Sequence, residues 1–539
     1  MTHHTKHSNT PRDIKKGTAL LRVVPDPIYR HAAPSGPWPW MNLDVDSDLA
    51  ASDTTVMDEP SLPWLDYPQN KFRNWTADPV QRSEMFEKCS KNKSSTIYWM
   101  DVRDSEDVTK RFTVPDMGEN DHGTTKVPIE DPQNKFWKML EQKASLMLKF
   151  RSEGIRVRTL FVDDLTSPVL RMLGTRYNIE PFFFTSSLNW IPSRYQEAPR
   201  HGEGDHVTIT LPFLRSQQKS QSPTDPKPLD SKTNTPIDIQ APFSTGGGHM
   251  FFIDLLAIHM VRGKESTIIS YHPESTGQLT SAKHLRSLIQ LVGKSVYWQK
   301  IFDKSKDPTF LFLAFLWYAL YEWDESLDSL YSYVGELELQ VLHLDNIALT
   351  HDLHVLEARL LHYQSLLHGF EVSVKFIETN PNPAMEVAAK KERMESGALM
   401  KKECKNLLNE IDRLERRRKM LSSRLKNAME LAFAIVNTED SRRMQRFTYL
   451  TIVFLPASFI ASIFGMNVME INNGTQTLTH YAVATVVLTL LTIYIIIMLQ
   501  KQNSVHRREA TLLQRAVWPI LSLQHVWVLQ YKKSLDDMA

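Results

Sequence analysis

Hydrophobic residues form two uninterrupted runs near the end of the chain. The runs Phe447–Phe464 and Tyr481–Leu499 contain no charged residue. Each is close to the ~20 helical residues that cross the hydrocarbon core of a bilayer. The pattern therefore predicts a two-helix transmembrane domain at 447–499, with spans at 447–464 and 481–499.

Basic residues flank this pair of runs but are absent between them. Those on the outer flanks are Arg442, Arg443, Arg446, Lys501, Arg507 and Arg508. The intervening segment Val468–His480 contains no Lys or Arg. By the positive-inside rule, only this loop faces outward. We expect an integral, multi-pass membrane protein with both termini in the cytosol.

Helical patterns precede the first run. The stretch Phe310–Glu378 predicts one or two helices, and Asn380–Pro383 ends them because proline removes a helical hydrogen bond. A new helix is expected from Met385 to Phe464, so the first span would end a helical stalk at 310–446. One apolar stripe follows this helix at Leu407, Ile411, Leu414, Leu421, Leu425 and Ala432. A matching surface is expected at Leu337, Val341, Leu342, Leu353, Leu356 and Leu360.

Short β-rich runs begin at Thr96. Strands are expected at 96–100, 157–162, 207–213, 251–260 and 267–271. Helices are expected at Asn134–Phe150 and Pro168–Arg176. The order predicts a cytosolic α/β domain at 93–309, with helices on the faces of a sheet.

Three segments have compositions that do not predict a folded core. Residues 1–92 are rich in Pro, Asp and Ser, and 216–249 in Ser, Thr, Pro, Lys and Gln, so both are predicted to be disordered. Trp38-Pro39-Trp40 and Trp64-Leu65 are either docking anchors or part of a tail that folds back onto its own domain. Residues 500–539 are expected to form a cytosolic tail.

Composition excludes several classes of function. The net charge is +1, and basic residues alternate with acidic ones, so no nucleic-acid partner is expected. Cys89 and Cys404, the only cysteines, fit a reducing compartment. No nucleophile–base spacing indicates an enzyme, and no cofactor is predicted.

The segment Phe454–Asn467, which ends in Gly465-Met466-Asn467, resembles the CorA family of magnesium transporters. This motif lies at the outer end of the first of two C-terminal runs, behind a proline-bearing helix and a long charged helix. The resemblance extends back to about Phe310, and Val157–Arg215 is more similar to a fungal branch. It implies a CorA-like funnel of α/β cytosolic domains, long stalk helices and two C-terminal transmembrane helices, assembled as a homopentamer.

Residues at steps of three and four predict the wall of a pore. They are Ser441, Met444, Thr448, Thr451, Leu455, Ser458 and Ser462. In an oligomer they would form hydroxyl rings and two apolar rings, at Met444 and Leu455. The alternative is that small hydroxyl residues only permit close helix packing.

The asparagine at the end of this stripe suits hydrated magnesium. Mg²⁺ loses its waters reluctantly, so a ring of Asn467 amides, with the Gly465 carbonyl below, would accept hydrogen bonds from those waters. Mg²⁺ is thus expected as the transported ion. The family resemblance also implies closure by intracellular Mg²⁺, for which Glu430, Glu403 and Glu410, with Asp163 and Asp164, are candidate ligands or ordinary surface acids.

Two functions from different classes follow. The first is a CorA-like channel for Mg²⁺ or related divalent cations, driven by the membrane potential, with lipid and copies of itself as partners. The second is a transport-inactive membrane scaffold or metal sensor that retains the architecture. No Arg-rich, acid-poor leader is present in the sequence, so the plasma membrane is preferred over vacuolar or mitochondrial membranes.

Overall fold

The computed structural model describes residues 62–105, 111–115, 123–129, 134–141, 154–197, 199, 202–218, 238–245, 248–263, 266–273, 282–343, 347–466 and 478–499. The predictions for 1–61, for the loop that contains Asn467 and for the tail 500–539 lie outside these residues. The chain separates into two compact units, Met1–Met429 and Glu430–Ala539.

The first unit is built on one mixed sheet. Its strands are β1 (Ser95–Arg103), β2 (Phe112–Thr113), β3 (Thr124–Val127), β4 (Ile155–Asp163), β5 (Ser193–Gln196), β6 (Gly204–Gln218), β7 (Phe243–Ser244), β8 (His249–Gly263) and β9 (Ser266–His272). The order is β2-β1-β4-β9-β8-β6-β5, with β3 paired to β1 and β7 to β8. β4 and β9 run parallel and the other pairs are antiparallel. All five predicted strands lie within these elements.

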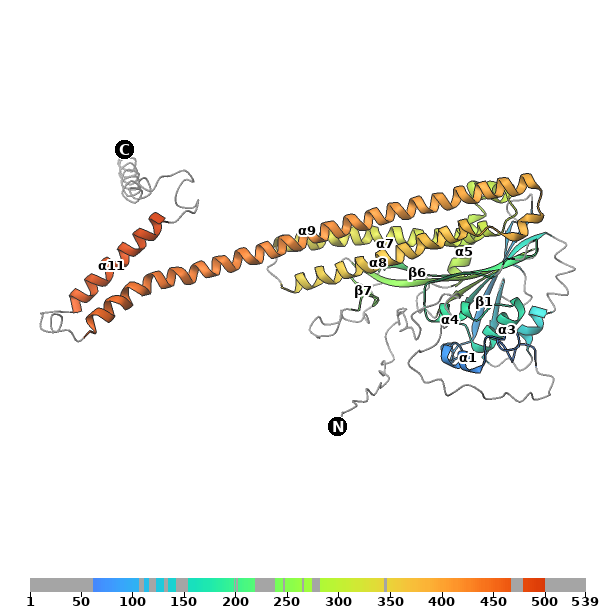
Figure 1. Ribbon diagram of the computed structural model, residues 1–539, viewed down its shortest axis with the longest axis horizontal. Coiled ribbons are helices and arrows are strands. Elements are labelled where there is room, and N and C mark those ends of the chain that lie inside the picture. The colour runs from blue at the N-terminus through green and yellow to red at the C-terminus, as the bar shows by residue number, and fades with distance from the viewer. Residues whose placement is uncertain are drawn as a thin grey trace, which may run out of the picture. The chain divides into compact units, whose positions relative to one another are not determined.

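Helices cover both faces of the sheet. Figure 1 shows α3 (Ser167–Tyr177) and α4 (Phe182–Leu188) on one side and α7 (Thr309–His343) and α8 (Ile347–Thr379) on the other. On β6, the hydroxyl of Thr210 lies 3.3 Å from that of Ser186 in α4, whereas Arg215 reaches the Tyr318 hydroxyl of α7 at 2.7 Å. Because both faces are covered, β6 and β8 are buried along almost their whole length.

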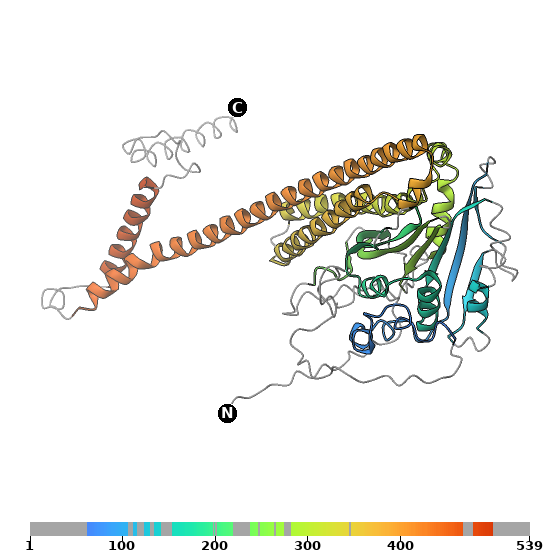
Figure 2. The same ribbon diagram turned by 45° about the vertical axis from the view of Figure 1, so that its right-hand side comes forward.

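Three helices extend from the domain as a stalk. After α5 (Ala282–Val292) and α6 (Val296–Lys304), the chain forms α7, α8, a short 3-10 turn at Pro383–Val387 and α9 (Lys390–Phe464), as Figure 2 shows. The predicted apolar stripe of α9 is buried at all six positions, Leu407 to Ala432. Of the predicted matching surface only Leu342 is wrong, because 59% of it is exposed.

The predicted disorder of residues 1–92 is wrong for the part that the structure describes. Residues 62–92 contain α1 (Ala77–Ser83) and insert Tyr67 and Trp75 into the domain with no exposed surface. The Tyr67 hydroxyl donates to the Ile179 carbonyl at 2.6 Å. Trp64 is also buried, so it belongs to a segment that folds back onto its own domain, while Trp38-Pro39-Trp40 lies outside the described residues.

The predicted disorder of 216–249 is wrong at both ends. At the first end, β6 continues to Gln218. At the second end, the segment contains β7, which pairs with β8, and β8 begins at His249. Arg359 of α8 holds the returning segment, since it donates to the carbonyls of Asp238 and Ala241 and lies over the Phe243 ring. Residues 219–237 lie outside the described residues.

Candidate functional site: the C-terminal apolar helices

The end of α9 is a long apolar helical segment. Within the described residues, α9 is the one helix with an apolar stretch long enough to span a bilayer, and α11 (Leu478–Leu499) has a shorter one at Thr479–Ile495. The apolar window of α9 is only 6% buried. The helix is therefore not the core helix of a soluble domain, because a core helix would be covered on all sides.

The predicted Gly-Met-Asn motif begins where α9 ends. The amide of Gly465 donates to the Ala461 carbonyl at 3.0 Å and that of Met466 to Ile463 at 3.2 Å, closing the last turn. A Cβ at Gly465 would lie 3.2 Å from the Ala461 oxygen, so a larger residue would crowd this turn. Met466 is exposed, and Asn467 lies outside the described residues.

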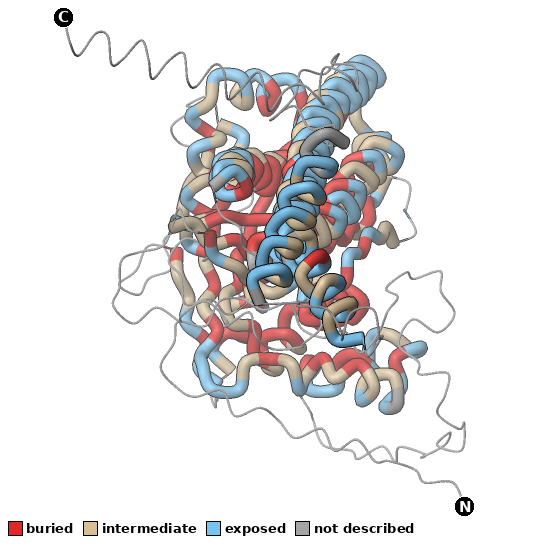
Figure 3. Tube along the Cα trace, turned by 90° about the vertical axis from the view of Figure 1, so that its left-hand side faces the viewer, coloured by how far each residue is buried: buried red, intermediate tan, exposed pale blue. Residues whose placement is uncertain are grey.

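The predicted pore stripe is exposed along its entire length. Ser441, Met444, Thr448, Thr451, Leu455, Ser458 and Ser462 are all exposed in the single chain. Figure 3 colours the exposed residues of the chain pale blue. The two apolar members, Met444 and Leu455, expose 74% and 72% of their surface. Because the stripe is exposed in one copy, it can contact another copy of the chain or line a water-filled pore.

Hydroxyl groups of the stripe donate to their own helix. Thr448 donates to the Met444 carbonyl at 3.0 Å, and Ser458 donates to Phe454 at 2.9 Å. Thr451 lies within 3.0 Å of two carbonyls, those of Phe447 and Thr448. Because the hydrogen is used on the backbone, each oxygen retains lone pairs that can accept a hydrogen bond from outside the helix.

A different face of α9 is covered. Pro456 is buried and Ile452, Ile460 and Ile463 are half-buried, at steps of four, four and three. The adjacent Phe464 meets Tyr481 of α11 edge to face, with ring centroids 5.7 Å apart. The hydroxyl stripe and the covered face share no residue, so packing against α11 does not explain the stripe.

The candidate regulatory carboxylates do not form a metal centre in one chain. Across the described ranges, no three His, Cys, Asp or Glu side chains meet in a group that could hold a metal ion. Glu430 is exposed on α9, and Glu410 pairs with Arg413 at 2.7 Å. Asp163 accepts from the first amide of α5 at 3.0 Å.

Glu403 is not a surface acid, contrary to one of the two readings from sequence. It is 1% exposed and accepts hydrogen bonds from the Tyr297 hydroxyl at 2.5 Å and the Asn406 amide at 3.2 Å. The pKa of Tyr297 is raised to about 12, chiefly by burial and then by Glu403. The hydrogen bond between Tyr297 and Glu403 joins α6 to α9.

Two ion pairs and a hydrogen bond that sequence reasoning missed attach α9 to the two other stalk helices. Arg417 reaches Asp324 of α7 at 3.1 Å, and Arg424 forms a two-bond pair with Glu338 at 3.0 and 2.6 Å. From α8, Glu357 accepts from the Ser422 hydroxyl at 2.9 Å. Spacing along one helix cannot reveal these pairs because each partner lies 65–93 residues away.

The described chain thus combines a folded α/β domain, a three-helix stalk and, at the end of α9, an apolar stretch long enough to span a membrane. Residues 257–502, a little under half of the chain, match the family model described as CorA-like Mg²⁺ transporter protein. This part of the chain is therefore similar to the CorA-like Mg²⁺ transporters.

Similar proteins match a limited region. The magnesium transport protein CorA of Pectobacterium atrosepticum is 29% identical over 99 residues, which are 18% of this chain and 30% of that protein. The Haemophilus ducreyi protein of the same name is 27% identical over 101 residues, 19% of this chain and 31% of that protein. The matches thus span less than a third of these relatives.

Two solved structures are similar to the chain at low identity. The complete CorA magnesium transporter from Methanocaldococcus jannaschii is 15% identical and covers 66% of this chain and 93% of its own, with a TM-score of 0.45. The full-length CmaX protein is 12% identical and covers 62% and 87%, with a TM-score of 0.39.

Proposed function

We propose that the chain is a channel for Mg²⁺ or a related divalent cation, with the hydroxyl stripe of α9 as the pore wall. The observation that carries this proposal is the uncovered stripe on α9, which leads directly to Gly465 and Met466. The match of residues 257–502 to the CorA-like Mg²⁺ transporter family model supports the same function.

The chemistry of the stripe suits a hydrated cation. Water bound to Mg²⁺ is held tightly and presents its hydrogens outward. Thr448, Thr451 and Ser458 already donate to their own helix, so their oxygens accept hydrogen bonds from those waters. Hydroxyl oxygens bind such a shell more weakly than carboxylates would, and conduction requires weak binding.

The mouth of the pore is assigned to Gly465, Met466 and Asn467. An amide ring at Asn467 would select the hydrated ion, and the Gly465 carbonyl would lie beneath that ring. Met444 and Leu455 form two apolar rings that close the conduit by excluding water.

A complete wall needs several copies, so the protein acts as a homo-oligomer, for which we propose a pentamer. The α9 and α11 helices cross the membrane, preferably the plasma membrane, and both termini lie in the cytosol. Mg²⁺ bridging carboxylates of adjacent copies would close the pore, with exposed Glu430 a candidate ligand and Glu410 a further one.

The second candidate function is a transport-inactive scaffold or sensor. The observation in its favour is that Glu470 is the only acidic residue between Gly465 and His480, so the outer loop concentrates cations little. On this alternative, the hydroxyl stripe would serve only to permit close packing between helices.

Magnesium uptake by a transport-deficient host tests the two functions. Asn467→Ala is compared with wild type and with Asn472→Ala, a matched change in the same outer segment, at equal membrane abundance. We expect uptake by wild type and Asn472→Ala and at least a tenfold loss for Asn467→Ala. If the wild-type chain inserts and assembles but carries no divalent ion, the channel proposal fails and the scaffold function replaces it.

A further inference from the structure

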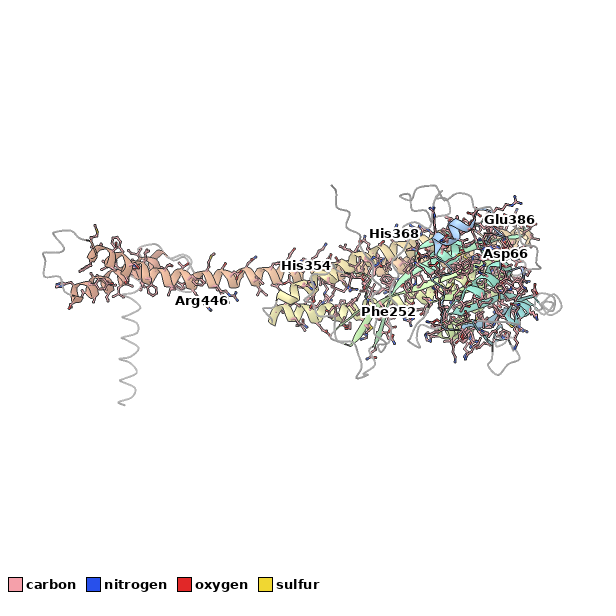
Figure 4. The ribbon with its side chains drawn as sticks, turned by 90° about the horizontal axis from the view of Figure 1, so that it is seen from below. Asp66, Phe252, His354, His368, Glu386 and Arg446 are labelled. Carbon is pink, nitrogen blue, oxygen red and sulfur yellow. The ribbon has the colours of Figure 1, made fainter. Side chains whose placement is uncertain are left out.

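A basic cluster lies on α9 immediately before its apolar run. Arg442, Arg443 and Arg446 are all exposed, and Figure 4 labels Arg446 on this helix. The next aromatic residues, Phe447 and Tyr449, expose 71% and 48% of their surface. Exposed aromatic rings beside arginines are typical of the level at which lipid headgroups meet the hydrocarbon core.

Two members of the cluster, Arg442 and Arg446, face away from the proposed pore wall, and Arg443 lies about 100° from Met444. An α-helix turns by about 100° per residue. Arg442 and Arg446 are each two positions from Met444, so they lie about 160° around the helix axis from it. Arg446 lies about 180° from Leu455, nine positions on.

The arginines share their face with lipid-type side chains. Steps of three and four lead from Arg443 to Arg446, Leu450 and Phe454, and the last two are 55% and 60% exposed. If α9 crosses a bilayer, this face would place its apolar side chains among the acyl chains and its arginines at the headgroups.

The ion pair that Asp440 forms with Arg443 is open to water. Asp440 lies 3.8 Å from Arg443, but both side chains are more than 65% exposed, so water screens the pair. Guanidinium groups bind phosphate and carboxylate oxygens in a two-bond geometry, and their long stems let the charge reach the headgroup layer.

We propose that Arg442, Arg443 and Arg446 form a binding surface for anionic lipid headgroups on the cytosolic leaflet. The orientation rests on the proposed function, because the pore stripe fixes which side of α9 faces lipid. The placement has a second benefit for that function, since these three positive charges stay off the path of a divalent cation.

Lipid selectivity in membranes tests this proposal without any measurement of ion flux. The full-length chain is reconstituted in phosphatidylcholine, and the motionally restricted fraction of spin-labelled phosphatidylserine is compared with that of spin-labelled phosphatidylcholine. We expect the preference for phosphatidylserine to fall by up to about fivefold per arginine in Arg442→Gln/Arg443→Gln/Arg446→Gln, the factor that corresponds to ~1 kcal/mol.

A matched variant controls for net charge. Lys391→Gln/Arg416→Gln/Lys419→Gln removes three exposed charges from α9 far from the apolar run and should keep the preference of wild type. The three Arg→Lys changes should retain most of it. Both Gln variants must assemble to the size of wild type.

Two outcomes would overturn the proposal. The first is an unchanged lipid preference in the assembled triple-arginine variant. The second is displacement of phosphatidylserine by inorganic phosphate but not by chloride at equal ionic strength, which would make the cluster a soluble-phosphate site. A chain that selects phosphatidylserine but conducts nothing would support this inference and refute only the channel.

Discussion

At the scale of single residues, burial controls the chemistry of both cysteines. Burial raises the pKa of Cys89 and of Cys404 to about 12. Arg171 acts in the opposite direction on the pKa of Cys89, whereas Glu378 and Glu403 raise the pKa of Cys404 further. The thiolate is the reactive form of cysteine. We therefore expect both thiols to react with a maleimide at pH 8 at least tenfold more slowly in the native protein than in urea, as mass spectrometry would show.

An introduced cysteine provides the control for this prediction. Met394, on α9 far from the apolar run, is 64% exposed, so Met394→Cys should be labelled rapidly in the same native sample. Native labelling of Cys89 or Cys404 at the rate of the introduced thiol would contradict the predicted protection.

His259 makes the α/β domain sensitive to acid. Its pKa lies well below the usual value, first because it is buried and second because His206 is close. Below about pH 6.5 the unfolded chain binds a proton at this histidine that the folded chain does not. The contribution of neutral His259 to the free energy of unfolding is therefore complete above that pH and falls below it. The contribution lost at pH 5.5 is on the order of 1 kcal/mol of unfolding free energy.

Urea unfolding at pH 7.5 and 5.5 measures this effect. We expect His259→Gln, which keeps a polar group near the Thr208 hydroxyl, to lose less stability than wild type between the two values. His351→Gln, at an exposed site on α8, should behave like wild type. Equal pH dependence in wild type and His259→Gln would refute the assignment.

At the scale of elements, ion pairs fasten α9 to α7. The two-bond pair between Arg424 and Glu338 is partly exposed, so its coupling is expected at about 0.5–1 kcal/mol after screening by water. A double-mutant cycle with Arg424→Ala and Glu338→Ala, measured by chemical unfolding, gives this energy. It should shrink in 1 M salt, and a coupling of zero at low salt would show that the pair is not formed in solution.

Element boundaries were predictable where one segment carries its own pattern. The stripe of α9 and the helix end before Pro381 could be read locally. The end of β6 could not, because Arg215 and the residues up to Gln218 look like loop. Arg215 is buried in the sheet because Asp254 on β8 and Glu322 on α7 each lie 3.1 Å away. Partners so distant in sequence also explain why the packing of Tyr67 against α3 was missed.

At the scale of the whole molecule, the proposed channel needs only the membrane potential. A divalent ion that enters a negative interior gains about 4.6 kcal/mol per 100 mV, equivalent to a concentration ratio of about 2,000. We expect Mg²⁺ entry into proteoliposomes to rise when a potassium diffusion potential makes the interior negative and to stop when the potential is reversed. Entry independent of the potential would contradict a channel.

The candidate pore stripe could be proposed from the sequence because its pattern lies within one helix. The stripe repeats within one helix, so its position could be read from Ser441 to Ser462, and the structure shows every member uncovered. The regulatory ligands could not be identified, because such a site would combine carboxylates of different copies. The burial of Glu403 depends on Tyr297, 106 residues away.

The backbone-directed hydroxyls of Thr448, Thr451 and Ser458 also decide which ions are refused. A chloride ion that sheds water must be solvated by hydrogen-bond donors, and these three groups have already used theirs. Such a wall would discriminate between the signs of charge while carrying none itself. Anion exclusion would thus be built into the rotamers of a few small side chains.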